Sequence, residues 1–395
     1  MKEENNMYDL VLNTIDTITP ARPWGIDIPN YFWFTGVSVA AFIISSFGNV
    51  FGMKSYKPIA GFSLLVAFVL LVAAPLNLID DLKQPGRISN FFTHGWENFP
   101  TSPMKWGVLI LVSYFFLLLF NVLIFYREYF VHAYHCTNNK FLKTIFKIAS
   151  LWRIKLGEAQ EQKNHKIGLI LSVIGIFFAL SVEGYTGYIL GATHGVALWH
   201  TPLMPILFLA SAMVGGTGLL VVILCIFQRF FADFKKIDYD MVDRLMKLLA
   251  WFIVIDLTIR FFWLTFAIPF NGEEKYALMR FFKANLTETI LIEYILCLLI
   301  PMVIGFVSKL RKNLFISLFG AAICSIGVWD FRWNIVIGGQ SIGRTTPGLL
   351  NYIPDFWGQD SIISALSNWG IFIALLCLVM AIFPWDKEMS KYYKQ

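Results

Sequence analysis

The sequence predicts an all-α polytopic membrane protein with about nine transmembrane helices, and three observations lead to this prediction. Hydrophobic residues make up 57% of the 395 residues and charged residues only 15%, whereas soluble domains carry about 25% charged residues. The chain has 38 phenylalanines and 13 tryptophans, as expected where aromatic rings gather at the bilayer interfaces. The apolar residues also fall into runs of about 18 or more, which is the length that a membrane-spanning helix needs.

Nine apolar runs divide the chain into a transmembrane domain over 32–384, a polar segment at 1–31 before it and a short tail at 385–395 after it. Because residues 1–30 contain no apolar signal-peptide core, we expect no cleaved leader. Residues 141–166 are expected to form either a loop or an amphipathic helix at the membrane interface. The nine expected helices are 32–53, 59–79, 106–126, 167–191, 203–228, 245–269, 287–307, 313–337 and 363–384.

Lysine and arginine are concentrated in alternate loops, which predicts the orientation of the chain. The loop 192–202 has none, whereas the loop between the third and fourth helices has Arg127, Lys140, Lys143, Lys147, Arg153, Lys155, Lys163 and Lys166. Cytoplasmic loops carry the positive excess, so we expect a periplasmic N-terminus and a cytoplasmic C-terminus in the inner (cytoplasmic) membrane. The net charge of +6 then reflects topology, and no nucleic acid partner is expected.

The cysteines and histidines argue against a metal cofactor in this chain. The five cysteines form no CxxC motif, and four of them lie inside apolar runs, whereas iron–sulfur clusters need several cysteines placed together. All six histidines lie in or next to loops, whereas membrane haems are held between histidines inside helices. We therefore expect no iron–sulfur cluster, no haem and no other metal site.

Ionisable residues inside the expected helices are the candidates for function, because such residues are costly in a membrane. Asp256 and Arg260 are four residues apart on one helix, so they share a face and can pair. Most of the set lies at one level in the outer half of the membrane, with Asp256 near the midplane. Two interpretations are open, buried structural ion pairs or a proton path, and the shared level across four helices favours the path. The set is Glu183, Asp256, Arg260, Glu293, Asp330 and Arg332.

Several motifs resemble those of the NrfD/PsrC family, the membrane subunits that exchange electrons between quinones and iron–sulfur proteins. They are PARPWGIDIPNYFWFTG at 20–36, WHTPLMPILFLASAMVGGTG at 199–218, VSKLRKN at 307–313 and RWNIVIGGQ at 332–340. The last is the most specific. The resemblance extends over about residues 20–385 and implies two four-helix bundles with the ninth helix appended.

The resemblance also implies a function for the chain. It implies a membrane anchor in a respiratory oxidoreductase of the polysulfide or sulfur reductase type, which carries the quinone site but not the terminal catalytic site. Menaquinone or ubiquinone would be its substrate. Its expected partners are a four-cluster ferredoxin-like iron–sulfur subunit and a molybdopterin catalytic subunit. The outer loops 80–105, 192–202, 270–286 and 338–362 are polar-aromatic and poor in net charge, and we expect them to hold the iron–sulfur subunit on the periplasmic face. Anchors of hydrogenases or of alternative complex III are the alternative within the family.

Quinol oxidation needs an apolar cleft, a hydrogen-bond partner for each ring oxygen and a group that accepts protons. The outer ends of the first and fourth helices supply such groups. The candidates for quinone binding are Asp27, Tyr31, Tyr185, Tyr188 and His194, with Glu183 as the proton acceptor.

Two further classes of protein compete with this hypothesis. A secondary transporter would place its site near the midplane at broken helices, whereas these helix interiors are mostly unbroken and their charges lie toward one side. A purely structural anchor would not need carboxylates such as Glu183, Asp256 and Glu293 in its spans.

Overall fold

The computed structural model describes residues 24–82, 85–155, 157–231, 237–269, 275–342, 349 and 352–385. Nine helical segments in these ranges are long and apolar enough to cross a membrane, as the sequence predicts. The protein is therefore a multi-pass membrane protein. The spans are formed by α2 (Asp27–Ser46), α3 (Lys57–Asp81), α5 (Pro103–Phe125), α8 (Glu158–Gly191), α9 (Met204–Phe230), α10 (Tyr239–Phe262), η6 (Thr287–Leu299) with α12 (Ile300–Phe306), α14 (Leu314–Trp333) and α16 (Ile362–Ile382).

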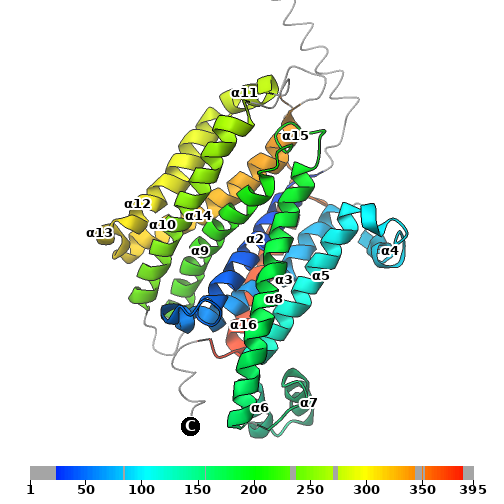
Figure 1. Cartoon of the computed structure of the whole chain (residues 1–395), viewed down its shortest axis with the longest axis vertical. Helices are drawn as coiled ribbons and strands as arrows, with labels where there is room; N and C mark the ends of the chain where they lie inside the picture. Colours follow the sequence, from blue (N-terminus) through cyan, green and yellow to red (C-terminus); the bar gives the residue numbers. More distant parts are fainter. Residues whose placement is uncertain are drawn as a thin grey trace, which may run out of the picture.

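The spans form two four-helix bundles and one additional helix (Figure 1). Helices α2, α3, α5 and α8 contact one another in a ring, and α9, α10, α14 and the η6–α12 segment form a second ring. The bundles meet where α9 packs against α2 and α8, and α16 packs on the outside of α3. This arrangement confirms the two bundles and the appended ninth helix.

Glycines of α9 allow this central helix to touch both bundles. A Cβ atom at Gly216 would lie 2.3 Å from the Ala40 Cβ atom in α2, and one at Gly218 would lie 2.7 Å from the Ala321 carbonyl oxygen in α14. Such close approach is what small residues provide between membrane helices. The helices α2, α3 and α9 are consequently mostly buried, whereas α5, α8 and α16 expose most of their surface.

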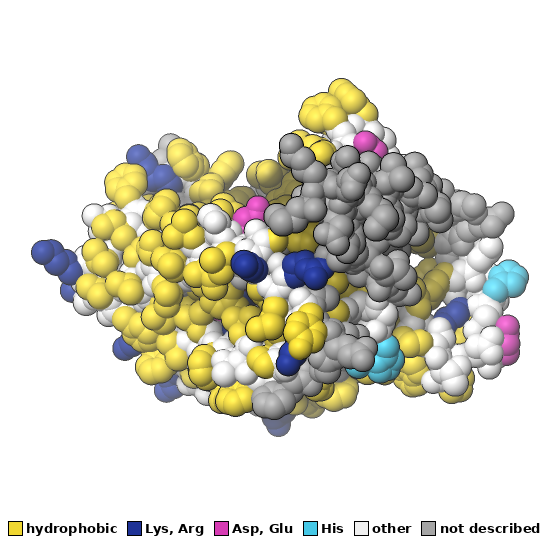
Figure 2. Space-filling view, turned by 90° about the horizontal axis from the view of Figure 1, so that it is seen from above, with side chains coloured by type: hydrophobic (Ala, Val, Ile, Leu, Met, Phe, Trp, Pro, Cys, Tyr) yellow, Lys and Arg dark blue, Asp and Glu magenta, His cyan; other side chains and the backbone are white. Residues whose placement is uncertain are grey.

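Shorter helices lie at the two ends of the bundles (Figure 1). The end that we call the basic end carries α6 (Arg127–Cys136), α7 (Lys140–Ala149), α13 (Ser308–Arg311) and the 3₁₀ turn η1 (Lys54–Tyr56). The end that we call the motif end carries η2 (Pro85–Arg87), α4 (Ile88–Thr93), η3 (Phe99–Thr101), the π-helical η4 (Trp263–Ala267), α11 (Lys275–Ala284), the π-helical η7 (Asn334–Gly338) and α15 (Gly339–Ser341). On the motif end, acidic side chains are scattered and hydrophobic ones are frequent (Figure 2).

Two helix boundaries differ from the prediction for physical reasons. The sequence predicts the first helix at 32–53, but the helix runs from Asp27 to Ser46. Its polar start contains Pro29, which the first turn of a helix tolerates, and the chain turns after Ser46 toward Gly52, whose φ is +69°. The fourth helix begins at Glu158 rather than 167, because its first turns are polar and hydropathy detects only the apolar part.

Candidate functional site

The first part of the site is an ion pair between the two bundles. Arg332 near the end of α14 binds Glu183 of α8, with 2.7 Å between Nη2 and Oε1, and neither side chain is exposed. The same Nη2 donates to the Phe208 carbonyl oxygen at 2.9 Å, and the guanidinium lies 3.7 Å from the centre of the Phe208 ring. A Cβ atom at Gly36 would lie 2.9 Å from Glu183 Oε1. The glycine therefore leaves room for this carboxylate against α2.

The second part is a buried triad inside the second bundle. Arg260 donates from Nε to Asp256 Oδ2 at 2.7 Å and from Nη1 to Glu293 Oε1. All three residues are at most 2% exposed. The contact between Asp256 and Arg260 confirms the pairing that their spacing predicts. The triad links α10 to η6 and places two carboxylates around one cation.

The two parts are joined by residues that the sequence analysis did not single out. The Arg260 guanidinium lies 3.9 Å from the centre of the Phe331 ring, and that of Arg332 lies 5.6 Å from the same ring. Asn334 donates from Nδ2 to Glu293 Oε2 at 3.1 Å and to Asp330 Oδ2 at 3.3 Å. The signal for Asn334 was present, since an amide interrupts the apolar run RWNIVIGG. The six ionisable candidates therefore form one network of two hydrogen-bonded parts, with the Phe331 ring between the pair and the triad.

Some polar atoms of the network have no hydrogen-bond partner among the described residues. They are Asp256 Oδ1, Glu183 Oε2, Arg260 Nη2 and the Nε and Nη1 atoms of Arg332. Buried polar groups are usually paired with protein or with ordered water, and buried waters fill such places. The network therefore has hydrogen-bonding capacity for water, which a proton path needs.

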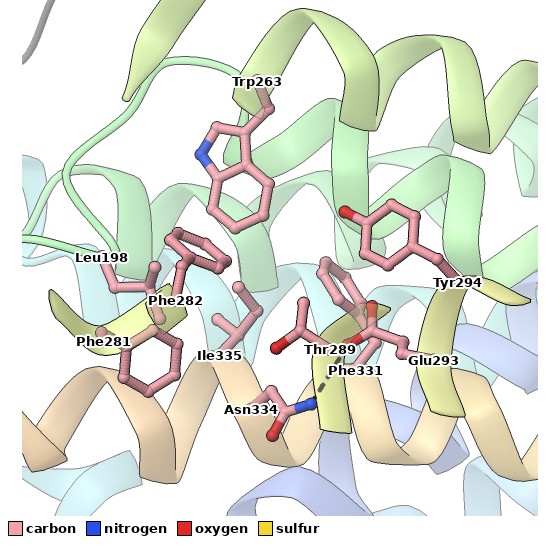
Figure 3. A pocket seen from close by; sticks show the side chains of 10 residues that line it. All are labelled: Leu198, Trp263, Phe281, Phe282, Thr289, Glu293, Tyr294, Phe331, Asn334 and Ile335. Atoms are coloured by element: carbon pink, nitrogen blue, oxygen red, sulfur yellow. Dashed lines mark hydrogen bonds between the residues drawn. The ribbon is translucent and has the colours of Figure 1, made fainter. Parts of the chain in front are cut away.

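A small cavity of about 10 Å³ borders the triad (Figure 3). Three π-helical segments line it, with Trp263 from η4, Thr289 and Glu293 from η6, and Asn334 from η7. Figure 3 shows aromatic rings surrounding the Glu293 and Asn334 side chains. A cavity of this size holds about one water, and π-helical turns occur frequently at functional sites.

Three of the four segments that carried the family resemblance meet at the motif end, whereas the segment 307–313 lies at the basic end. Trp24 stacks on Trp199 with 5.2 Å between ring centres, and Trp199 donates from Nε1 to the Ile335 carbonyl oxygen at 2.6 Å. Gln340 donates to the Trp24 carbonyl oxygen at 3.0 Å and accepts from its N–H at 3.2 Å. A Cβ atom at Gly339 would lie 2.2 Å from Trp199 Nε1. Motifs far apart in the sequence thus form one packed structure above the network.

A second polar cluster lies where α2 begins, beside α16. Asp27 accepts from Ser364 Oγ at 3.2 Å through Oδ2, while Asp27 Oδ1 is buried with no partner among the described residues. Asn30 accepts from Trp329 Nε1 at 2.6 Å, while its Nδ2 is likewise buried without a described partner. One free acceptor and one free donor therefore lie three residues apart on α2. Sequence analysis identified Asp27 but missed Asn30.

The other quinone-binding candidates are distributed along the motif end. Tyr31 follows Asn30 on α2 and is 9% exposed. Tyr185 donates its hydroxyl to the Pro103 carbonyl oxygen of α5, and Tyr188 is 53% exposed. His194 lies 2.8 Å from His200 between ring nitrogens, in the loop after α8. Asp27 and Tyr31 thus lie about one turn apart on α2, and Tyr185 of α8 is close enough to Tyr31 for the two side chains to interact electrostatically.

The fold and site define a class of protein: a polytopic membrane protein of two four-helix bundles with a charge network buried between and within them. Comparison with known proteins specifies the family. The family model described as polysulphide reductase, NrfD, matches residues 13–343. The chain belongs to this family.

Three relatives illustrate the likeness. The C subunit of selenate reductase from Mesobacillus selenatarsenatis is 26% identical over 389 residues, covering 94% of this chain and 88% of the relative. The Hdr-like menaquinol oxidoreductase integral membrane subunit of Archaeoglobus fulgidus is 24% identical, covering 58% of this chain and 48% of the relative. The C subunit of polysulfide reductase from Wolinella succinogenes is 29% identical, covering 49% of this chain and 55% of the relative.

Proposed function

We propose that this chain is the quinone-reactive membrane subunit of a respiratory oxidoreductase. It exchanges electrons between menaquinone or ubiquinone and an iron–sulfur partner, while its buried carboxylates exchange the protons. The names of its relatives include reductases of selenate and polysulfide and a menaquinol oxidoreductase. The catalytic partner in the proposal is accordingly a molybdopterin reductase of the polysulfide or sulfur type.

The observation that carries this proposal is the network of six ionisable residues, all of which are buried except the half-buried Asp330. Oxidation of a quinol releases two electrons and two protons, and a membrane interior has little water to take the protons. Carboxylates within hydrogen-bond reach of a headgroup act as general bases in such a reaction. A protein that served only as an anchor would bury apolar residues here, because replacing buried ion pairs by well-packed apolar residues is often neutral or stabilising.

The quinone headgroup in this proposal binds at the motif end of α2, beside Asp27, Asn30 and Tyr31. The free Nδ2 of Asn30 donates to a quinone carbonyl oxygen, and the free Oδ1 of Asp27 accepts from a quinol hydroxyl. The Glu183 carboxylate lies against Gly36, which follows Tyr31 on α2 by just over one turn. This carboxylate links the headgroup site to Arg332 and the rest of the network. Tyr185, Tyr188 and His194 stay predictions for contacts near the entrance.

The test is Asn30→Leu in the complete complex with its native partner subunits. We expect the loss of one donor to a bound headgroup to cost about tenfold or more in kcat/KM for quinol, since a hydrogen bond of this kind contributes about 1.4 kcal/mol or more. Activity with an artificial electron donor to the partners should be unchanged. The matched control is Asn121→Leu, a buried asparagine of α5 that bonds Ser172 near the basic end. Equal quinol kinetics in Asn30→Leu and wild type would contradict the headgroup site.

The proposed orientation places the motif end in the periplasm and the basic end in the cytoplasm. The sequence supports it, because lysines and arginines gather in the loops of the basic end. The iron–sulfur partner then docks on the motif end, which carries α4 and α11 (Figure 1). Of the loops predicted to hold the partner, residues 83–84, 270–274, 343–348 and 350–351 lie outside the described residues.

The orientation is tested by a reporter fused after Gln395. We expect a reporter that works only in the cytoplasm to be active there, because nine spans place the two termini on opposite sides. A companion fusion carries a reporter that works only in the periplasm at the same position, and it should be silent. Activity of the periplasmic reporter would reverse the orientation and move the partner to the other face.

A further inference from the structure

A helical hairpin at the basic end presents an apolar surface that the protein itself does not cover. The hairpin consists of α6 and α7, which pack against each other (Figure 1). We define the apolar stripe as Phe141, Ile145 and Ile148, which follow one another at helical spacing on α7, together with Trp152 in the turn after the helix. Their exposed fractions are 72%, 42%, 50% and 64%. By the same spacing Lys143 and Lys147 lie on the opposite side of the helix, where both are half-buried and the Lys143 Nζ lies 5.8 Å from the centre of the Tyr134 ring of α6, while Lys140 lies on the flank.

A helix of similar design at the motif end shows that such a face is normally covered. The ten-residue α11 is also amphipathic, yet its apolar residues Leu278 and Phe281 are only 1% and 4% exposed. They pack into the second bundle. No residue of α7 is buried. The uncovered face of α7 is therefore a property of this helix rather than of short helices in the fold.

Hydrogen bonds fix the hairpin at the level where the apolar spans begin. The buried Arg127 donates to the Arg153 carbonyl oxygen at 2.9 Å and to Asn164 of α8. Asn164 lies three residues before the apolar run of α8, which starts at Ile167. Tyr129, two residues after Arg127 in the first turn of α6, donates to the carbonyl oxygen of Ile382, the last residue of α16. Both anchors place the hairpin at the inner boundary of the membrane-spanning region.

The turn after α7 holds Trp152 outward at a conformational cost. Leu151 and Trp152 have φ values of 56° and 62°, a region that large side chains adopt rarely. Strain of this kind persists where the surroundings require it, yet the Trp152 indole contacts mainly Lys147, whose Nζ lies 5.3 Å from the ring centre. An exposed tryptophan at this level matches the aromatic belt of membrane interfaces.

The charge of the hairpin segment favours a lipid surface over a protein as the partner that covers the apolar stripe. The segment 129–157 contains five lysines and arginines and no aspartate or glutamate. Basic residues with an apolar stripe on the opposite side are the pattern of helices that lie in the interface of an anionic leaflet. We propose that α7 is a lipid-binding helix whose apolar stripe enters the headgroup–acyl boundary while its lysines bind anionic phospholipid headgroups. This surface is separate from the quinone site and does not depend on it.

The test uses the full chain in nanodiscs of phosphatidylcholine, with or without phosphatidylglycerol. The exposed Cys136 and Cys377 are first replaced by serine. A nitroxide is then attached to Phe141→Cys or Ile148→Cys on the stripe, or to Lys143→Cys on the opposite side as the matched control. Collisions with oxygen report an apolar environment, and collisions with a water-soluble nickel chelate report water.

We expect the nitroxides on the stripe to collide more often with oxygen, and the nitroxide at Lys143→Cys to collide more often with the nickel chelate. Phosphatidylglycerol should increase the shielding of the stripe, and replacing all three lysines of α7 by glutamine should remove this increase, because each basic residue near an anionic surface contributes about fivefold in partition. Nickel access to both sides in every nanodisc would overturn the proposal. Shielding that appears only after partner subunits are added would assign the stripe to a protein instead. Shielding that is insensitive to phosphatidylglycerol would overturn the assignment of anionic lipid.

Discussion

The two arginines of the network occupy similar surroundings but differ in the number of carboxylates around them. Arg332 has one carboxylate, Glu183, and Arg260 has two, Asp256 and Glu293. Each guanidinium lies over an aromatic ring, and neither is exposed. The pair of Arg332 is electrically neutral when both groups are ionised. The triad of Arg260 is neutral only when one of its carboxylates carries a proton.

This difference indicates which part of the network holds a transferable proton. An uncompensated charge is costly in a low-dielectric interior, so the triad is most stable with one extra proton shared by its carboxylates. The pair needs no such proton. We infer that the triad, with Asn334 and Asp330 beside it, stores a proton, while Glu183 links this store to the headgroup site.

The largest expected effect comes from removing each arginine in turn. Arg260→Met removes a cation that contacts two buried carboxylates, so both must then be protonated and both lose a guanidinium hydrogen bond, whereas Arg332→Met leaves one carboxylate that loses one such contact. Breaking a buried pair costs about 3–5 kcal/mol, so we expect Arg260→Met to reduce the amount of folded protein more severely. Thermal stability in detergent measures the difference. The double variant Arg332→Met, Glu183→Gln should recover most of the stability. Equal losses in the two single variants would refute the difference in charge balance.

The next largest expected effect is a loss of quinol-linked turnover in variants that still assemble. Glu183→Gln and Glu293→Gln keep the shape of each side chain but remove the proton acceptor. Both variants should assemble with the partner subunits and lose about 10²–10⁴-fold in quinol-linked turnover, the usual contribution of a general base. Activity with an artificial donor should persist. Loss in Glu293→Gln alone would confine proton transfer to the triad, and normal turnover in both would show that neither carboxylate carries an essential proton.

The smallest expected effect comes from a substitution that perturbs the Glu183–Arg332 pair and leaves the triad intact. In Gly36→Ala the new Cβ atom lies 2.9 Å from Glu183 Oε1 and 3.1 Å from the Ala212 Cβ atom. Overpacking of this kind costs about 1–3 kcal/mol. The matched control is Gly370→Ala in α16, where an added Cβ meets nothing within 4 Å and we expect no loss. Unchanged thermal stability in Gly36→Ala would show that Glu183 has freedom to move.

Much of the site was predictable because ionisable residues in apolar runs are conspicuous. Glu183, Arg260 and Arg332 each interrupt a hydrophobic stretch. Charged residues inside a membrane are costly and rare, so each of them is a functional candidate. Asn30 and Asn334 were missed because a single amide in an apolar run is a weaker signal. Phe331 was missed because nothing in a sequence distinguishes a ring beside a guanidinium from the other 37 phenylalanines.

At the basic end, the sequence likewise did not predict where the helices begin and end. The lysine pattern at 141–166 indicated an interfacial amphipathic helix as one of two possibilities. The structure divides this segment, with α7 ending at Ala149 and α8 beginning at Glu158. Helix boundaries in polar sequence depend on local hydrogen bonds such as those of Arg127, which hydropathy does not detect.

The sequence by itself determined the number of spans and the identity of the buried charges. Both follow from the cost of exposing polar groups to lipid, which is a local property of each segment. The pairing of Asp256 with Arg260 also followed from their spacing, whereas tertiary structure alone decided that Glu293 faces Arg260 and that Glu183 faces Arg332. Glu183 and Arg332 are 149 residues apart, and their contact depends on how α8, α9 and α14 pack. The division into a neutral pair and a protonatable triad is therefore a consequence of helix packing, which sets the distances between charges that the sequence only supplies.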